Sequence, residues 1–526
     1  MPTSFDIVET LTSQIRPLEV EHNLAWWASS TDVSEENMQR RITADVAHGN
    51  AMGDASTYSE VRAAIDCDDG TDPLYSRQLA VLSDAMTPQQ VPADLRTELA
   101  ELEALVDSTF NSFRGSINDE PLNDNALLRR LRETDESIER RMAWEATKQI
   151  GVEVESQIRE LARLRNRAAT HLGFRDHFAL ALSTGELSEE RLLTTLEEVD
   201  RATAAPFAAW KHDLDTDLAE RFGCGINDLR PWHYDDPFFQ DAQTYGTVDL
   251  DPYFADVDLE DLTIRTYSGM GLDIRNAMKA SDLLPRERKS QHAFCIDVDH
   301  EGDVRVLCNN TPSERWAETM LHEFGHAIYD LEVSPQLPWL LRTMHPLATE
   351  GIAMLFGRLT RNPEWLIQIL GVAETEVETL TADLVTTHRA ALLVFARWVL
   401  VMTTFERALY EDPERDLNTL WWDLVERFQG ISKPEGRDRP DWASKLHLAL
   451  APVYYQNYLY GELVASQLQA CLNANFGGIV DRTAAGALLR DKFFAPGQSL
   501  RWDQLIEHVT GEPLSVRHLA TELASP

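Results

Sequence analysis

Two histidines four positions apart give the sequence its clearest chemical signature. The run His322-Glu323-Phe324-Gly325-His326 has the pattern H-E-x-x-H. On an α-helix, residues i and i+4 share a face, so both imidazoles can bind one zinc ion. Glu323 then lies beside the open coordination position, where it can act as a general base. The pattern predicts a catalytic zinc site on a helix.

A catalytic zinc site needs a third protein ligand, because three ligands leave one position for water. Glu350 lies 24 positions after His326, in a second apolar helix that is expected to begin near Pro346. Pro335 and Pro338 lie between the two helices and indicate a turn. We therefore predict one zinc ion, held by the two histidines and Glu350. Without that partner, the histidine pair would more simply be a solvated helix face.

The helix that carries the two histidines has its own start signals. Thr311 is expected to be its N-cap, Pro312 its first residue, and Glu314 the partner in a capping box. Gly325 inside the helix costs about 1 kcal/mol relative to alanine. We therefore expect another element to pack closely against the helix at this glycine.

A β-hairpin is expected immediately before this helix, over residues 290–308, with its turn at Glu301-Gly302. In a register with a two-residue loop, Cys295 faces Cys308 across the strands. The chain has five scattered cysteines, an odd number that indicates no disulfide framework. We therefore expect buried thiols here, with a disulfide as the alternative under oxidising conditions.

The rest of the chain is predicted to be mainly α-helical. Residues 7–48 and 125–172 have helical periodicity, and Ser188 is the expected N-cap of a helix that runs to about residue 222. Residues 231–252 are rich in aromatic residues and proline and form the longest predicted loop, which would line a substrate channel or form a packed surface belt. No internal repeat and no domain boundary are evident.

Composition limits the classes of partner. The 526 residues carry a net charge of −39, a field that repels nucleic acid and anionic membranes. Inspection finds no apolar run long enough to span a bilayer, so no membrane partner is expected. The N-terminal residues lack the basic and apolar regions of a signal peptide, which predicts a cytoplasmic protein. The sequence gives no indication of the oligomeric state.

A second group of polar residues lies late in the chain. Lys445 and His447 precede four tyrosines, among which Tyr455 and Tyr458 are three positions apart on one predicted helix face. Peptide hydrolysis needs hydrogen-bond donors for the developing oxyanion, and histidine and tyrosine can supply them. Taken alone, tyrosines on a helix more often serve packing, and a lysine is more often a surface charge.

Together these residues resemble the angiotensin-converting-enzyme family of zinc peptidyl-dipeptidases, in the gluzincin clan. The resemblance rests on H-E-x-G-H, on the glutamate 24 positions later, on His292-Ala293, which begins 30 positions before the first zinc histidine, and on Lys445-x-His447 followed by Tyr-x-x-Tyr. It implies a helical ellipsoid with a deep central substrate channel between two lobes and a small hairpin beside the zinc helix. It also implies a single domain over residues 1–526, with the helices up to about residue 112 as a channel lid.

The resemblance further implies a role for each matching residue and a peptide as the substrate. The implied roles are zinc binding for His322, His326 and Glu350, general base and then acid for Glu323, oxyanion stabilisation for His447 and Tyr458, binding of the substrate's terminal carboxylate for Lys445 and Tyr455, and backbone pairing with the substrate for His292 and Ala293.

The chain departs from the family pattern at several positions. The spacing from His447 to the tyrosines is one residue longer, so Tyr454 and Tyr455 are alternatives for one role. Asn457 replaces an arginine that binds chloride, and Met354 replaces an aspartate next to the zinc ligands. The family's carboxylate-binding glutamine has no evident match, and its disulfide around the hairpin is not reproduced.

Three functional hypotheses follow. The first is a zinc metallopeptidase that releases dipeptides from the C-terminus of short peptides. The alternative within the clan is an oligopeptidase of the thimet type, which cleaves internal bonds in a similar helical channel. The third is a zinc-containing binding protein without catalysis, and the presence of Glu323 together with the tyrosine-histidine group argues against it.

Overall fold

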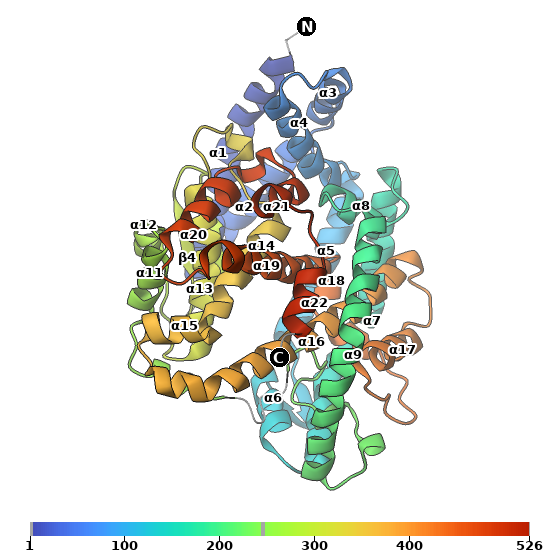
Figure 1. Ribbon diagram of the computed structural model, residues 1–526. Helices are drawn as coiled ribbons and strands as arrows, with labels where there is room; N and C mark the ends of the chain where they lie inside the picture. The colour runs from blue at the N-terminus through green and yellow to red at the C-terminus, as the bar shows by residue number, and fades with distance from the viewer. Residues whose placement is uncertain (1–3, 243–247, 525–526) are drawn as a thin grey trace. The chain divides into compact units, whose positions relative to one another are not determined.

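Helices dominate the computed structural model, which describes residues 4–242 and 248–524 (Figure 1). The chain divides into two compact units, each assembled from three chain segments. Unit 1 comprises Met1–Gln90, Val248–Leu384 and Tyr460–Leu519, and unit 2 comprises Val91–Thr247, Val385–Leu459 and Ala520–Pro526. The prediction of a mainly α protein is confirmed.

Unit 1 contains the N-terminal helices, the predicted hairpin and both helices of the predicted zinc site. Its helices and strands are α1 (Ser4–Thr31), α2 (Glu35–Met52), α3 (Ala55–Cys67), α4 (Pro73–Met86), α10 (Asp251–Phe254), α11 (Leu259–Gly269), α12 (Arg275–Ala280), β3 (Phe294–Asp297), β4 (Val304–Leu307), α13 (Glu314–Glu332), α14 (Pro346–Gly357), α15 (Pro363–Trp365), α20 (Thr483–Leu488) and α21 (Trp502–Thr510).

Unit 2 contains the long helices of the middle of the chain. Its helices and strands are α5 (Ala93–Ser112), β1 (Gly115–Ile117), β2 (Glu120–Leu122), α6 (Asp124–Glu133), α7 (Ser137–His171), α8 (His177–Thr184), α9 (Glu189–Phe222), α17 (Leu417–Gln429) and α18 (His447–Leu450). The unit boundaries fall inside three further helices, α16 (Glu374–Glu411), α19 (Tyr455–Phe476) and α22 (Arg517–Ala524).

The core of unit 1 is built around α13, which packs against α14. The apolar face of α13 is fully buried at residues such as Met320, Leu321 and Phe324. The helices approach closely at Gly325, where an added Cβ would lie 2.9 Å from the Cα of Ala353. Only glycine permits such a backbone approach, so the expectation of close packing at this position is confirmed.

The start of α13 lies two residues later than the sequence predicted. Ser313, not Thr311, is the N-cap, and its hydroxyl accepts a hydrogen bond of 3.3 Å from Trp316 N. Glu314 is therefore the first helical residue and not the third residue of a capping box. There its carboxylate accepts hydrogen bonds from Thr360 (2.8 Å) and Arg361 (3.1 Å), so a tertiary contact takes the place of the local one.

The hairpin exists, but its strands are shorter and its loop is longer than predicted. Phe294–Asp297 pairs antiparallel with Val304–Leu307, and Cys295 lies opposite Val306. The register therefore differs by two residues from the predicted one, and Cys295 does not face Cys308. The six-residue loop is closed by a hydrogen bond from Val298 N to Asp303 O. All five cysteines are free thiols, and of the pair expected to be buried, Cys308 is buried and Cys295 is half-buried.

A second two-stranded sheet, β1–β2, was missed from the sequence. Its strands have only three residues each, too few for an alternating pattern to be visible. The signal lies in the turn, because Asn118 (φ 52°) and Asp119 (φ 65°) both adopt the positive φ that a two-residue hairpin turn needs.

The long aromatic loop packs against α7 and α9 of unit 2. Arg140, which is fully buried, donates to Trp232 O (2.7 Å) and to Asp235 (3.0 Å). Lys211 on α9 donates to the hydroxyl of Tyr234 at 2.7 Å. Residues 231–236 are thus a packed belt, and residues 243–247 of the predicted loop lie outside the described residues.

One long helix corrects the sequence-based statement about membrane spans. Within the described residues, α16 contains an 18-residue window with the length and apolar composition of a membrane span, which inspection of the sequence overlooked. Of this window, 61% is buried inside the protein. That burial is what a core helix shows, so the composition of α16 is weak evidence for a membrane.

The predicted lid helices divide between the units. Helices α1 to α4 belong to unit 1, where α1 contacts the hairpin. Asn23 on α1 donates to Asp297 O at 3.2 Å, and Glu19 lies 2.8 Å from His300 Nε2. Helix α5 belongs to unit 2. The lid assignment and the single-domain assignment remain predictions.

Candidate active site

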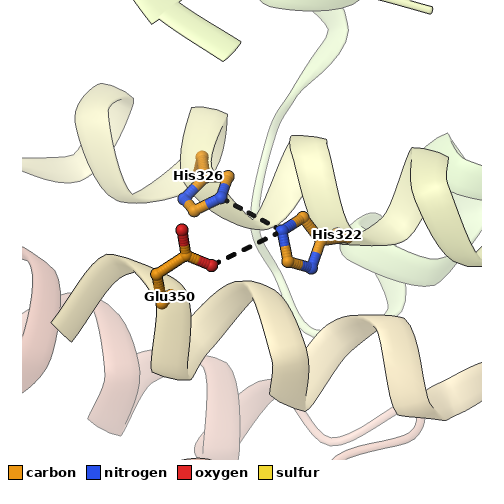
Figure 2. A group of neighbouring side chains, drawn as sticks. All are labelled: His322, His326 and Glu350. Atoms are coloured by element: carbon orange, nitrogen blue, oxygen red, sulfur yellow. Dashed lines mark hydrogen bonds and ion pairs between the residues drawn. The ribbon is translucent and has the colours of Figure 1, made fainter. Parts of the chain in front are cut away.

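The two histidines of the H-E-x-x-H motif and Glu350 converge on one point (Figure 2). His322 and His326 project from successive turns of α13, and Glu350 projects from α14. The Nε2 atoms of the histidines lie 3.3 Å apart, and His322 Nε2 lies 3.8 Å from Glu350 Oε2. Each residue offers a ligand atom within 4.8 Å of the others. The glutamate that the sequence analysis named as the third ligand thus lies beside the histidine pair, and its binding of zinc stays a prediction.

The three side chains fit a zinc ion. Two nitrogens bound at roughly 2.05 Å to a tetrahedral ion lie roughly 3.3 Å apart, which is the separation observed. Burial lowers the pKa of His322 to about 4 and that of His326 well below its usual value. Both imidazoles are therefore neutral at pH 7, the state that binds metal. Two histidines and one glutamate form a known donor set of catalytic zinc sites.

Thr349 orients the second histidine, a role that the sequence analysis missed. Its hydroxyl forms a short hydrogen bond with His326 Nδ1. When Nδ1 carries the proton, it donates to Thr349 Oγ1 and leaves the Nε2 lone pair facing the other ligands. Thr349 is the fourth residue of α14, whose N-cap is His345. Its place directly before Glu350 is the signal that could have revealed it.

Glycine also permits the close packing behind Glu350. An added Cβ on Gly461 of α19 would lie 3.0 Å from both Glu350 Cβ and Met354 Sδ. The thioether of Met354 thus packs under α19, at the position where the resembling family has an aspartate. Within unit 1, Thr349 supplies a polar partner to the histidine and Met354 fills space.

Glu323 is buried next to the ligands, with 8% of its surface exposed. Burial raises the pKa of Glu323 to about 8, the negative charge of Glu350 adds to the rise, and the backbone N–H of Cys295 opposes it. A carboxyl group with a pKa near neutrality can both take and return a proton. Within the described residues, Glu323 is thus a buried carboxyl group whose pKa is shifted toward neutrality, and its role as general base stays a prediction.

His292 and Ala293 lie directly before β3 and not on it, because the strand begins at Phe294. His292 is exposed and Ala293 is half-buried. The two residues that precede Phe294, the first residue of β3, are therefore accessible at least in part. Their predicted pairing with a substrate backbone stays a prediction.

The second predicted group lies in unit 2, around Lys445. Lys445 is buried, and burial lowers its pKa to about 8, although Asp236 and Asp241 raise it. Its Nζ donates a short hydrogen bond to Gln240 Oε1 and lies 5.7 Å from the ring centre of Tyr455. These contacts place a cation, an amide and a phenol together.

Gln240 is the second residue that the sequence analysis missed. It directly follows the aromatic pair Phe238-Phe239, four positions after the packed belt, and it is the first polar side chain after three apolar ones. An isolated amide after an aromatic run is a weak signal, and Lys445 lies more than 200 positions away along the chain. Only the fold could bring the two together.

His447, Tyr455 and Tyr458 form one aromatic cluster with the lysine. The ring centres of His447 and Tyr455 are 4.9 Å apart, and those of Tyr455 and Tyr458 are 5.7 Å apart. Burial and the charge of Lys445 lower the pKa of His447 to about 4, so its imidazole is neutral at pH 7. A neutral imidazole and two phenols can donate hydrogen bonds without adding charge.

A mainly helical protein with an H-E-x-x-H helix, a glutamate from the next helix and a buried carboxyl beside them has a metallopeptidase-type site. A family model described as angiotensin-converting enzyme matches residues 4–204 and 285–521 of this chain. The chain therefore belongs to the angiotensin-converting-enzyme family, whose members depend on zinc. Gln240 lies between the two matched ranges.

Curated relatives agree with this family assignment. The chain is 26% identical over 230 residues to angiotensin-converting enzyme of Oryctolagus cuniculus, an alignment that covers 41% of this chain and 17% of the relative. It is 25% identical over 234 residues to the enzyme of Bos taurus, which covers 42% of this chain and 18% of the relative. The alignments thus span less than a fifth of each of these relatives.

Proposed function

We propose that the protein is a zinc metallopeptidase that releases dipeptides from the free C-terminus of short peptides. The observation that carries this proposal is the convergence of His322, His326 and Glu350 beside the buried carboxyl group of Glu323. Membership of the angiotensin-converting-enzyme family supports a peptidase, and the donor set supports zinc.

His322, His326 and Glu350 would hold the ion. Zinc, when bound, supplies Lewis acidity that lowers the pKa of water and polarises a peptide carbonyl. Glu323 takes the proton from the water whose oxygen attacks the carbonyl carbon. It then passes that proton to the nitrogen of the leaving amine as the C–N bond breaks.

Residues of unit 2 would stabilise and position the peptide. We assign oxyanion stabilisation to His447 and Tyr458, which carry neutral hydrogen-bond donors. We assign the terminal carboxylate to Lys445 and Tyr455, joined by Gln240 because its side chain is hydrogen-bonded to the lysine. The assignment requires one peptide to engage both groups of residues, and His292 and Ala293 to pair with its backbone.

The terminal-carboxylate assignment decides between this proposal and an internal-cleaving oligopeptidase. A lysine that binds the terminal carboxylate sets the distance from the C-terminus to the cleaved bond. The test uses one peptide of about ten residues in two forms, with a free and with an amidated C-terminus, and identifies the products by mass spectrometry. We expect stepwise dipeptide release from the free acid and at least roughly tenfold slower cleavage of the amide, because a charge-assisted contact contributes about 1.5–3 kcal/mol.

A matched variant separates binding of the terminal carboxylate from hydrolysis of the peptide bond. Lys445→Met keeps the length of the side chain and removes its charge, so it should raise KM for the free acid and leave cleavage of the amide unchanged. Equal cleavage of both peptide forms by the unaltered protein, at internal bonds, would favour the oligopeptidase instead.

A further inference from the structure

The segment that leads into α19 contains an unusual backbone conformation. Val453 has a φ of +54° and is the one β-branched residue with a positive φ among the residues that the structure describes. A branched Cβ makes this left-handed conformation costly, and it persists only where the surroundings enforce it. Its side chain is buried, with 5% exposed. Something in unit 2 must therefore hold the main chain of Val453 in place.

The carboxyl group of Glu406 holds it. Val453 N donates a hydrogen bond of 2.7 Å to Glu406 Oε1, and Glu406 is buried on α16 with 2% exposed. The side-chain amide of Gln456 donates to Val453 O. Both main-chain polar groups of Val453 thus have side-chain partners, which is the form of support that an unfavourable conformation requires.

A buried cation holds the helix that precedes this connection, α18. Arg165 on α7 is 4% exposed and donates to Leu448 O (3.3 Å) and to Ala449 O. The end of α18 is therefore held by a guanidinium at its carbonyl groups, and the connection from α18 to α19 is held by a carboxyl group at the N–H of Val453. The contacts of Arg165 and Glu406 use backbone groups that a loop would otherwise turn toward water.

The left-handed residue lies just before the tyrosine that stands beside Lys445. Each residue added at a helix start rotates the following side chains by about 100°. Tyr455, two residues after the left-handed Val453, has its ring centre 4.9 Å from that of His447 and 5.7 Å from Lys445 Nζ, and it is 4% exposed. Tyr454 is half-buried and its ring packs against that of another tyrosine. The residue by which this chain exceeds the family spacing lies in this segment.

We propose that Glu406 is a positioning residue that sets recognition of the substrate's C-terminal carboxylate. By fixing Val453 in the left-handed conformation, it places Tyr455 beside Lys445. Glu406 acts through the main chain of Val453, to which it is hydrogen-bonded. This inference rests on the proposed function, because it assigns Lys445 and Tyr455 to the carboxylate.

The test compares Glu406→Leu with Glu406→Gln, which keeps an oxygen that accepts the Val453 N–H. We expect Glu406→Leu to raise KM for the free-acid peptide about tenfold, which is the change in affinity that the loss of one buried hydrogen bond typically causes. The kcat of Glu406→Leu and its rate of cleavage of the amidated peptide should stay within about threefold of those of the unaltered protein, a smaller change than the loss of one buried hydrogen bond causes. Glu406→Gln should retain the KM of the unaltered protein.

A rescue experiment distinguishes positioning from general stability. Glycine adopts a positive φ without the penalty of a branched side chain. Val453→Gly introduced into Glu406→Leu should therefore recover most of the lost KM, although it restores no contact of the carboxyl group. Circular dichroism and melting temperature report folding in parallel. If Glu406→Leu does not fold, Val453→Pro tests the same contact, because proline lacks the N–H and cannot adopt this φ.

Two results would overturn the inference. One is an equal loss of activity toward the free and amidated peptides in Glu406→Leu. The other is a folded double variant with no recovery of KM. Failure of the proposed function is recognised separately, because the unaltered protein would then cleave both peptides equally, before any variant is considered.

Discussion

Replacement of Thr349 by valine should weaken zinc binding about tenfold. Valine has nearly the shape of threonine but cannot accept the hydrogen bond from His326 Nδ1. Loss of such a partner next to a metal ligand typically costs 10- to 100-fold in affinity, or about 1.4–2.8 kcal/mol. Both side chains are half-buried, so water can replace part of the lost bond. The expected effect therefore lies at the lower end of this range.

The assay is a competition titration of the metal-free protein with a chromophoric zinc chelator at constant pH. Thr349→Ser is the matched control, because it retains the hydroxyl and removes only a methyl group, and its affinity should stay within about threefold. Melting temperatures of the metal-free proteins separate binding from folding. Unchanged affinity in Thr349→Val, or an equal loss in Thr349→Ser, would refute the reasoning that the hydroxyl orients His326.

Three further predictions test other parts of the site. Glu323→Gln should bind zinc with a Kd within about threefold of that of the unaltered protein, as calorimetry can measure. Its kcat in peptide kinetics should fall at least roughly a hundredfold, because an amide cannot take a proton from water. Unchanged turnover would contradict the assignment of Glu323 as general base. Gly325→Ala should lower the free energy of unfolding by about 1–3 kcal/mol in urea titrations, since the added Cβ would lie 2.9 Å from Ala353 Cα. The control is Gly49→Ala, where an added Cβ has no atom within 4 Å, and it should raise the free energy of unfolding by about 0.5–1 kcal/mol. Burial raises the pKa of Glu406 to about 8, so the contribution of this residue to stability is greatest below pH 4.5 and is lost as the pH rises to 8. The melting temperature of Glu406→Gln should therefore rise relative to that of the unaltered protein across this range, and a constant difference would contradict the burial argument.

Local patterns in the sequence predicted the helices that carry the zinc site. The four-residue histidine spacing fixes a face of α13, and proline signals mark the turn before α14, so the meeting of Glu350 with the histidines could be anticipated. Ser188 is the N-cap of α9, as predicted. The start of α13 was misplaced because Ser313 and Thr311 are both good caps, and the tertiary contacts of Glu314 decide between them.

Long-range pairing set the limit of prediction. The loop between the hairpin strands consists of the six residues 298–303, whereas the prediction assumed a two-residue turn. The predicted pairing of Cys295 with Cys308 was therefore wrong. The contact of Gln240 with Lys445 joins segments far apart in the sequence. The positive φ of Val453 depends on Glu406, a residue 47 positions earlier, and no local preference of valine indicates it.

Several expectations from composition stay predictions. The net charge of −39 favours partners other than nucleic acid and anionic membranes, and the cytoplasmic location also stays a prediction. The chloride independence expected from Asn457 also remains to be measured. Activity assays with and without chloride, on the same free-acid peptide, address that point.

The coordination of zinc in the purified protein tests the central claim most directly. A zinc K-edge X-ray absorption spectrum should show about one ion per chain, with imidazole nitrogens and a carboxylate oxygen at roughly 2.0–2.2 Å. The signal of two imidazoles should fall to one in His326→Ala or His322→Ala. Sulfur neighbours at roughly 2.3 Å, or a spectrum that is unchanged in Glu350→Ala, would contradict a metal held jointly by α13 and α14.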